Sequence, residues 1–226
     1  MFTLIFLLLF QSKGSILWLL PNHHTCVSIR AVFYSIMAEI SSLISKFRPD
    51  LSSYEDLYKF FHSHPELSHQ ELETAAKIAA ELSKLNAFEN HTGIGGHGLA
   101  AVLRNGPGVT VLLRADIDGL PVREETRLAY ASTVRMKDRF GVEQPVMHAC
   151  GHDMHLTALL AAAELLVRAK AFWSGTVILC FQPAEERGEG ARAMVSDGLY
   201  DKVPLPDVLL GAHVVPTRAG LYTRGS

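Results

Sequence analysis

The segment from Met147 to His155 concentrates side chains that bind metals. It reads Met-His-Ala-Cys-Gly-His-Asp-Met-His and stands immediately before a long apolar stretch with helical spacing. A second polar segment, Phe181-Gln-Pro-Ala-Glu-Glu186, comes later, and a lone His213 follows it. Cysteine, histidine and glutamate are ligands of zinc-like divalent ions, and a second glutamate beside a ligand glutamate can act as a general base. The pattern therefore indicates metal-assisted hydrolysis.

Cys150 and His152 are two residues apart on a predicted loop, so both side chains can reach one metal centre. A metal would keep the cysteine as thiolate and the histidine neutral. An isolated Cys-x-His would be read as a buried thiol beside surface histidines, but partners elsewhere in the chain favour the metal reading. Asp153 and His155 are expected at the start of a helix or in support of the ligands.

Glu185 and Glu186 are adjacent on a predicted loop and therefore point in different directions. One can ligate a metal while the other removes a proton from metal-bound water and passes it to the leaving amine. The alternative is a solvated acidic turn, continued by Arg187 and Glu189.

Asp116 and Asp118 are either ligands or groups that orient histidine ligands. Asp118 also fits a turn residue before Gly119 and Pro121. His213 is the remaining ligand candidate, and its assignment depends on the others. No role is assigned to five further histidines, His62, His64, His69, His91 and His97.

The elements that must position these residues can be predicted from hydrophobic spacing. Apolar runs predict strands at 99–103, 109–115, 177–181 and 208–212, and helical spacing predicts helices at 52–62, from Leu72 to Leu85, and at 155–169 and 190–199. Ser52–Glu55 and Ser68–Glu71 have the spacing of capping boxes. The alternation predicts an α/β domain with a mostly parallel sheet and helices on both faces. The polar clusters follow strand ends, where open α/β sheets bind ligands, so they are expected to converge.

Composition excludes some classes of protein. The chain has 226 residues, 48% hydrophobic and 19% charged, with a net charge of −2, which gives no reason to expect nucleic acid or an anionic membrane as partner. Three scattered cysteines favour a reducing compartment, hence the cytoplasm. Residues 1–36 form an apolar leader of doubtful status, whose interrupted runs fall short of the ~20 residues that span a bilayer. Met37 is a plausible start of the protein, and residues 37–226 are expected to form the folded domain. No stable membrane association is expected.

With these residues assembled, the chain resembles the zinc aminoacylase-type metallopeptidases. It is most similar to the amidohydrolase branch that contains hippurate hydrolases and auxin–amino-acid conjugate hydrolases. The resemblance runs from about Tyr54 to the C-terminus and rests on an ordered series of motifs. These are His62-Ser-His-Pro-Glu-Leu-Ser68, Leu113-Arg-Ala-Asp-Ile-Asp-Gly-Leu-Pro121, Met147–His155, Phe181–Glu186 and Gly211-Ala-His213.

The resemblance implies a site as well as a fold. The fold would be a phosphorylase/hydrolase-like zinc exopeptidase catalytic domain, and the metal ligands would be Cys150, His152, Glu186 and His213. They would hold two divalent ions, Zn²⁺ or Mn²⁺, with Glu185 as general base and acid. Asp116 and Asp118 would support them. The substrates implied are small N-acyl or peptidyl amino acids, cleaved at the amide bond.

The chain departs from the family at its end. Relatives continue into a lid domain, through which they form homodimers, and then return to complete the catalytic domain. This chain stops at Ser226, so an incomplete catalytic domain is expected. The alternative function is a non-catalytic remnant that keeps the fold and a partial metal site. A cysteine hydrolase that uses Cys150 would be a third, weaker possibility, because it leaves the glutamate pair and His213 unexplained.

Overall fold

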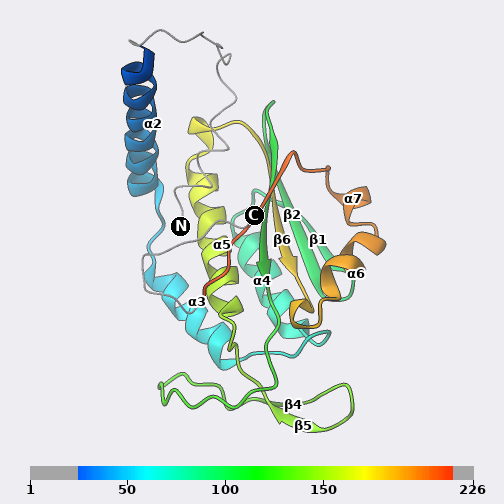
Figure 1. The fold of residues 1–226 in the computed structure, drawn as a ribbon. Coiled ribbons are helices and arrows are strands. Elements are labelled where there is room, and N and C mark those ends of the chain that lie inside the picture. Colours follow the sequence, from blue (N-terminus) through cyan, green and yellow to red (C-terminus); the bar gives the residue numbers. More distant parts are fainter. Residues whose placement is uncertain (1–24, 216–226) are drawn as a thin grey trace.

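A five-stranded mixed sheet forms the centre of the molecule (Figure 1). The computed structural model describes residues 25–215, with side chains from Tyr34 onward. The sheet order is β1-β2-β6-β3-β7, and a separate hairpin pairs β4 with β5. The strands are β1 (Glu89–Ile94), β2 (Gly98–Asn105), β3 (Thr110–Asp116), β4 (Arg135–Lys137), β5 (Glu143–Pro145), β6 (Gly175–Gln182) and β7 (Val208–Gly211). β2 runs antiparallel to both neighbours, and the other four strands share one direction.

Helices cover both faces of this sheet. They are α2 (Thr25–Phe47), α3 (Ser52–Ser63), α4 (Leu72–Lys84), α5 (His152–Arg168), α6 (Gly190–Ser196) and α7 (Leu199–Lys202). Alternate strand residues point to opposite faces, so Leu113 packs in the cluster with α3, α4 and α5, and Leu112 packs in the cluster with α6 and α7. The fold class predicted from the sequence is confirmed.

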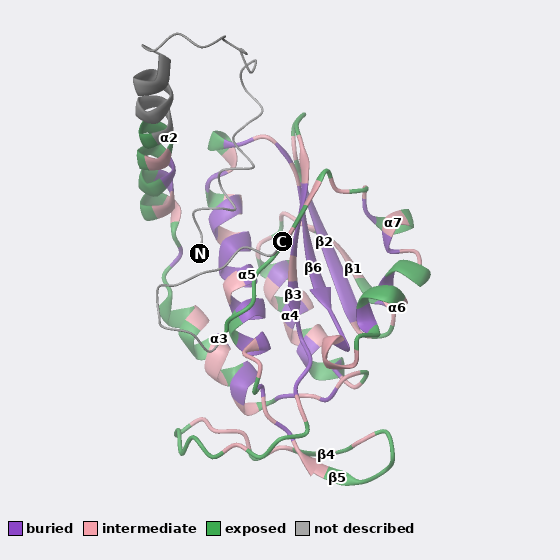
Figure 2. Ribbon diagram, viewed as in Figure 1, coloured by how far each residue is buried: buried purple, intermediate pink, exposed green. Residues whose placement is uncertain are grey.

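The strands form where they do because their side chains are buried on both faces. Figure 2 shows β2 and β6 buried along most of their length, and α5 is buried on nearly every turn. Phe181 and Leu113 are almost inaccessible to solvent, and burying such side chains stabilises the fold by about 1.5–3 kcal/mol each. The continuous apolar runs of the sequence are therefore the central strands.

Other elements differ from the prediction. β1 and the β4–β5 hairpin were not predicted, because their residues are polar or glycine-rich and show no period. The helix expected at 155–169 begins at His152, and the helix expected at 190–199 is two helices. They are separated at Gly198, whose φ of 76° ends α6. The prediction of a capping box at Ser52 is wrong, because the Ser52 hydroxyl donates a hydrogen bond to Asp50 and α3 has no side-chain cap.

The N-terminal leader can be compared with the structure only in part. Residues 1–24 lie outside the described part of the chain, as do residues 216–226. Within the described part, α2 runs through Met37. No helix between residues 25 and 215 combines the length and apolar character needed to cross a membrane.

Candidate metal centre

The chemistry-bearing residues lie where the parallel strands end. β3 ends at Asp116 and β6 at Gln182, and these two residues are register partners. The short 3₁₀ turn Glu185–Arg187 follows β6, His213 follows the end of β7, and His152 is the first residue of α5. The convergence expected from the strand ends is therefore observed.

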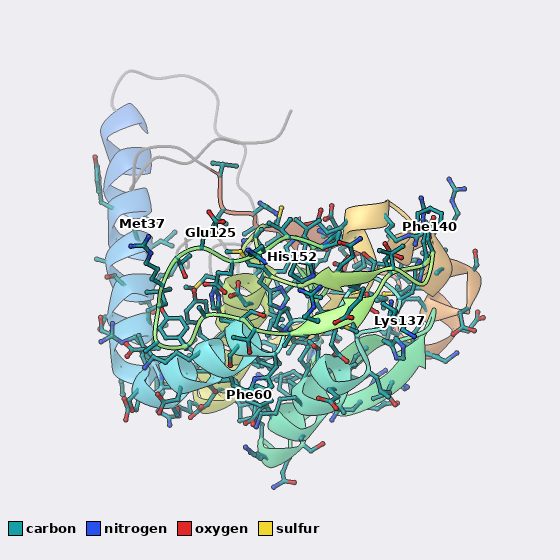
Figure 3. All side chains as sticks on the ribbon, turned by 90° about the horizontal axis from the view of Figure 1, so that it is seen from below. Met37, Phe60, Glu125, Lys137, Phe140 and His152 are labelled. Atoms are coloured by element: carbon teal, nitrogen blue, oxygen red, sulfur yellow. The ribbon has the colours of Figure 1, made fainter. Side chains whose placement is uncertain are left out.

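A long loop and the β4–β5 hairpin frame this end of the sheet. In Figure 3, which looks onto it, His152 lies between the loop that carries Glu125 and the hairpin tip that carries Lys137 and Phe140. An open groove of about 750 Å³ runs beside the site and is lined by residues that include Leu67, Leu120, Phe140 and Glu186. The site is thus reachable from solvent.

His152 is the centre of the arrangement. Its Nδ1 donates to the backbone carbonyl of Asp118 at 2.9 Å, which leaves the Nε2 lone pair free. Three carboxylates surround that nitrogen, with oxygens of Glu185 at 3.7 Å, Glu186 at 3.8 Å and Asp116 at 4.0 Å. These separations are too long for hydrogen bonds but suit groups that share a cation.

Two groups of potential ligand atoms share this histidine. In the first, Cys150, His152 and His213 have one ligand atom each within 4.8 Å of the others. In the second, the same holds for Asp116, His152 and Glu185. The two groups place a soft sulfur and nitrogen set beside a harder carboxylate set, which suits two neighbouring divalent ions.

Unpartnered buried atoms test whether a metal would fit. His152 Nε2, Asp118 Oδ1 and Glu186 Oε1 are buried and have no hydrogen-bond partner among the described residues. All three present lone pairs, because the histidine proton is on Nδ1 and the carboxylates carry none when ionised. Lone pairs cannot satisfy one another, whereas a cation between His152 Nε2 and Glu186 Oε1, which lie 3.8 Å apart, would satisfy both. Asp118 Oδ1 lies instead 3.5 Å from the other ring nitrogen, Nδ1. The residues therefore fit a divalent metal.

Asp118 connects several of the candidate ligand residues. Its Oδ2 accepts hydrogen bonds from the Ser68 hydroxyl at 2.7 Å and from the Glu186 backbone N–H at 3.1 Å. Burial disfavours its ionisation, but His152, Ser68 and the Glu186 N–H outweigh burial and lower the pKa of Asp118. The capping box predicted at Ser68 is wrong, because the Ser68 hydroxyl donates to Asp118 and α4 begins without a side-chain cap.

Negative charge dominates the electrostatics of the site. The neighbouring Glu186 carboxylate, with burial and the charge of Glu185, raises the pKa of the Cys150 thiol to about 11. Burial also raises the pKa of Asp116, against the opposing charge of Arg114. Nucleophilic cysteines occupy electropositive surroundings, so this environment counts against the cysteine-hydrolase reading. A divalent cation would reverse the effect and favour the thiolate.

The two adjacent glutamates differ in exposure. The Glu186 side chain is 17% exposed and carries the unpartnered buried oxygen, whereas that of Glu185 is 37% exposed. Both carboxylates lie at nearly the same distance from His152. The two glutamates therefore differ in solvent exposure but not in their distance from His152.

Two residues beside the site, His62 and Glu124, were given no role from the sequence, whereas Asp153 was expected at the helix start or in support of the ligands. His62 on α3 lies between two carboxylates, with Nδ1 at 2.7 Å from Asp153 and Nε2 at 3.0 Å from Glu124. Asp153 follows His152 in α5, and Glu124 also accepts the Ser132 backbone N–H. His62 thus connects α3, the loop after β3 and the start of α5. No sequence period links positions so far apart.

Two more histidines of the Met147–His155 segment are buried. Burial lowers the pKa of both His148 and His155 to about 4. His155 accepts a hydrogen bond from the backbone N–H of Val214, next to His213. Both ring nitrogens of His148 are without a hydrogen-bond partner among the described residues.

Replacing Gly190 with alanine is expected to disturb the loop that carries the glutamate pair. A Cβ at this position would lie 1.6 Å from the carbonyl oxygen of Pro183, so the backbone leading to Glu185 must shift. Such overpacking costs typically about 1–3 kcal/mol, measurable as a lower midpoint of urea unfolding. Gly211→Ala is the control, because a Cβ there meets nothing. Equal midpoints for both variants would contradict the argument.

Comparison with known proteins gives consistent matches. Residues 112–223, about half of the chain, match peptidase family M20/M25/M40. The chain is 40% identical over 164 residues to hippurate hydrolase of Campylobacter jejuni, which covers 72% of this chain and 39% of that enzyme. Over 179 residues it is 38% identical to thermostable carboxypeptidase 1 of Saccharolobus solfataricus, covering 76% of this chain and 42% of the relative.

A solved structure supports the same assignment. The Bacillus subtilis YXEP protein, a dinuclear metal-binding peptidase of the M20 family, matches with a TM-score of 0.63 and 34% identity. The match covers 76% of this chain and 44% of that one. The chain thus spans about two fifths of the length of the curated relatives it matches.

Proposed function

Because the chain belongs to peptidase family M20/M25/M40, we propose that it carries the metal centre of an amidohydrolase that cleaves N-acyl or peptidyl amino acids. The observation that carries the proposal is the gathering of three carboxylates, those of Asp116, Glu185 and Glu186, around the unpartnered His152 Nε2. Relatives named for this chemistry, such as the hippurate hydrolase, support the substrate class. We propose further that residues 37–226 are the N-terminal part of the catalytic domain and that full-length relatives form homodimers through the lid.

The proposed ligands of two divalent ions are Cys150, His152, Glu186 and His213. Two neighbouring groups of ligand atoms, one with Cys150 and His213 and the other with Asp116 and Glu185, support a pair of ions, and His152 would ligate one of them through Nε2. When bound, such ions would polarise the amide carbonyl and lower the pKa of water at the site. Thiolate favours Zn²⁺, whereas the carboxylates also accept Mn²⁺.

Glu185 is the proposed general base and acid. Its greater exposure leaves it free to face the substrate, while Glu186 is turned inward. The Glu185 carboxylate takes a proton from water as the water oxygen bonds to the amide carbon. It then gives that proton to the amide nitrogen as the C–N bond breaks, which releases a carboxylic acid and a free amino acid. The groove beside Glu186 would hold the substrate.

Metal binding by the purified chain tests the proposal. The metal-stripped chain is titrated with Zn²⁺ and with Mn²⁺, alongside Cys150→Ser and Glu186→Gln. Each variant is expected to bind at least about 10–100-fold more weakly, since even groups that only support ligands cost that much. Cys180→Ala and Glu89→Gln are matched controls, because Cys180 is buried within β6 and Glu89, on β1, pairs with Arg104 of β2.

The outcomes separate the two candidate functions. Binding lost in both variants, with hydrolysis of an N-benzoyl or N-acetyl amino acid by the loaded chain, supports the amidohydrolase. Metal bound at this site without turnover supports the non-catalytic remnant. Absence of metal binding by the wild-type chain, or binding indifferent to both substitutions, would overturn the proposed centre.

A further inference from the structure

The segment after β7 is held against the start of α5 by Val214. In Figure 1 this segment runs beside α5, and the contact is a hydrogen bond from the Val214 backbone N–H to His155 Nε2 at 2.9 Å. Because the N–H is a donor, Nε2 accepts, and the His155 proton is on Nδ1. The buried His155 ring therefore acts as a fixed acceptor for a segment whose residues are otherwise exposed.

Val214 makes two more contacts at the same place. Its side chain lies over Gly151, where an added Cβ would be 2.7 Å from Val214 Cγ2. Its carbonyl oxygen lies 2.5 Å from Nδ1 of His213 and accepts a hydrogen bond from that nitrogen. That bond leaves the His213 Nε2 lone pair free for a metal, since the hydrogen bond made by one ring nitrogen sets the role of the other.

The ring positions agree with this arrangement. His213 packs edge to face on His155, with ring centroids 4.6 Å apart, and stands perpendicular to His152 at 5.5 Å. β7 ends at Gly211, so no strand hydrogen bond among the described residues holds His213 itself. The hydrogen bond from the Val214 N–H to His155 is the contact, one residue beyond His213, that ties this segment to α5.

We propose that His155 is a positioning residue: by binding the Val214 N–H it places His213 to complete the metal centre. The inference deepens the proposed function and rests on it for the ligand role of His213. His155 does not touch the metal in this scheme. It acts through the backbone of Val214, as groups behind metal ligands commonly do.

The test uses cobalt as a spectroscopic metal in the full chain. His155→Leu removes the acceptor, whereas His155→Gln keeps a carbonyl oxygen that can reach the Val214 N–H. His155→Leu is expected to give the cobalt spectrum of His213→Ala and about 10–100-fold weaker metal binding, and His155→Gln is expected to resemble wild type. Met154→Leu, an exposed neighbour on α5, is the control.

Hydrogen exchange of the Val214 amide tests the contact without any metal. It is expected to be slow in wild type and His155→Gln and fast in His155→Leu. Wild-type metal affinity and spectrum in His155→Leu would overturn the inference while leaving the metal centre intact. Fast exchange of the Val214 amide in the wild-type chain would also overturn it. Failure of the wild-type chain to bind cobalt, with the Val214 amide protected, would instead reject the proposed function.

Discussion

Replacing Glu185 with glutamine is expected to lower the rate of amide hydrolysis by about 10²–10⁴-fold and to leave metal binding unchanged. Glutamine preserves the size and polarity of the side chain but cannot take a proton from water at neutral pH. The Glu185 carboxylate is more exposed than that of Glu186, so its loss leaves no buried partner unsatisfied. The measurement is the initial rate on an N-acyl amino acid, together with metal stoichiometry.

Two further variants make this result specific. Glu186→Gln should lose metal as well as activity, and Glu89→Gln, remote on β1, should change neither. An unchanged rate in Glu185→Gln would show that another group moves the proton. Loss of metal in Glu185→Gln would make Glu185 a ligand, as its grouping with Asp116 and His152 allows, and the base would then have to be sought elsewhere.

Replacing His62 with leucine is expected to lower the free energy of unfolding by about 3–5 kcal/mol. The substitution leaves Asp153 and Glu124, whose side chains are 2% and 0% exposed, without their shared partner. Removing one member of a buried charged set costs more than removing the whole set. Adding Glu124→Gln and Asp153→Asn to His62→Leu should therefore restore part of the loss. Urea unfolding measures each step.

The contribution of His62 to the free energy of unfolding is expected to decrease as the pH rises. Burial opposes the charge on His62, but the carboxylates of Glu124 and Asp153 outweigh it and raise the pKa above its ordinary value of 6.5. The native state therefore holds this proton more tightly than the unfolded chain does. Its contribution to stability is complete below pH 6.5 and is lost as the pH rises through the raised pKa.

The comparison with His62→Leu isolates this contribution. The difference in unfolding free energy between wild type and variant should shrink as the pH rises through that range, in metal-free protein. His64→Leu is the control, since His64 is exposed and its replacement should change stability by only about 0.5 kcal/mol. A difference that is constant with pH would mean that His62 is not charged in the native state.

Much of the sheet could be predicted because burial on two faces leaves a plain sequence pattern. The runs that became β2, β3, β6 and β7 are apolar almost without interruption, and a rule about strand ends then brought Asp116, Glu185 and His213 to one edge. β1 could not be predicted, since it is an edge strand whose side chains are mostly exposed. The β4–β5 hairpin is too short and polar to show a period.

The supporting residues of the site were harder to predict for a different reason. Ser68 has the spacing of a helix cap, yet its hydroxyl binds Asp118, far away in sequence. His62 lies between carboxylates that only the folded chain brings together. Such contacts depend on tertiary structure alone, whereas the side chains that do chemistry were recognisable by type. Sequence therefore indicates which residues could act, and the fold determines what holds them in place.

The pairing of β7 with β3 has a consequence for how the protein is made. The hydrogen bond from the Thr110 N–H to Asp207, which leads into β7, joins residues 97 positions apart. Such non-local pairing is slow, because the chain loses much freedom before the contact forms. During synthesis, Cys150 and the two glutamates leave the ribosome before β7 and His213 do, since translation proceeds from the N-terminus. A growing chain therefore exposes a thiol and several carboxylates for a time before β7 and His213 emerge.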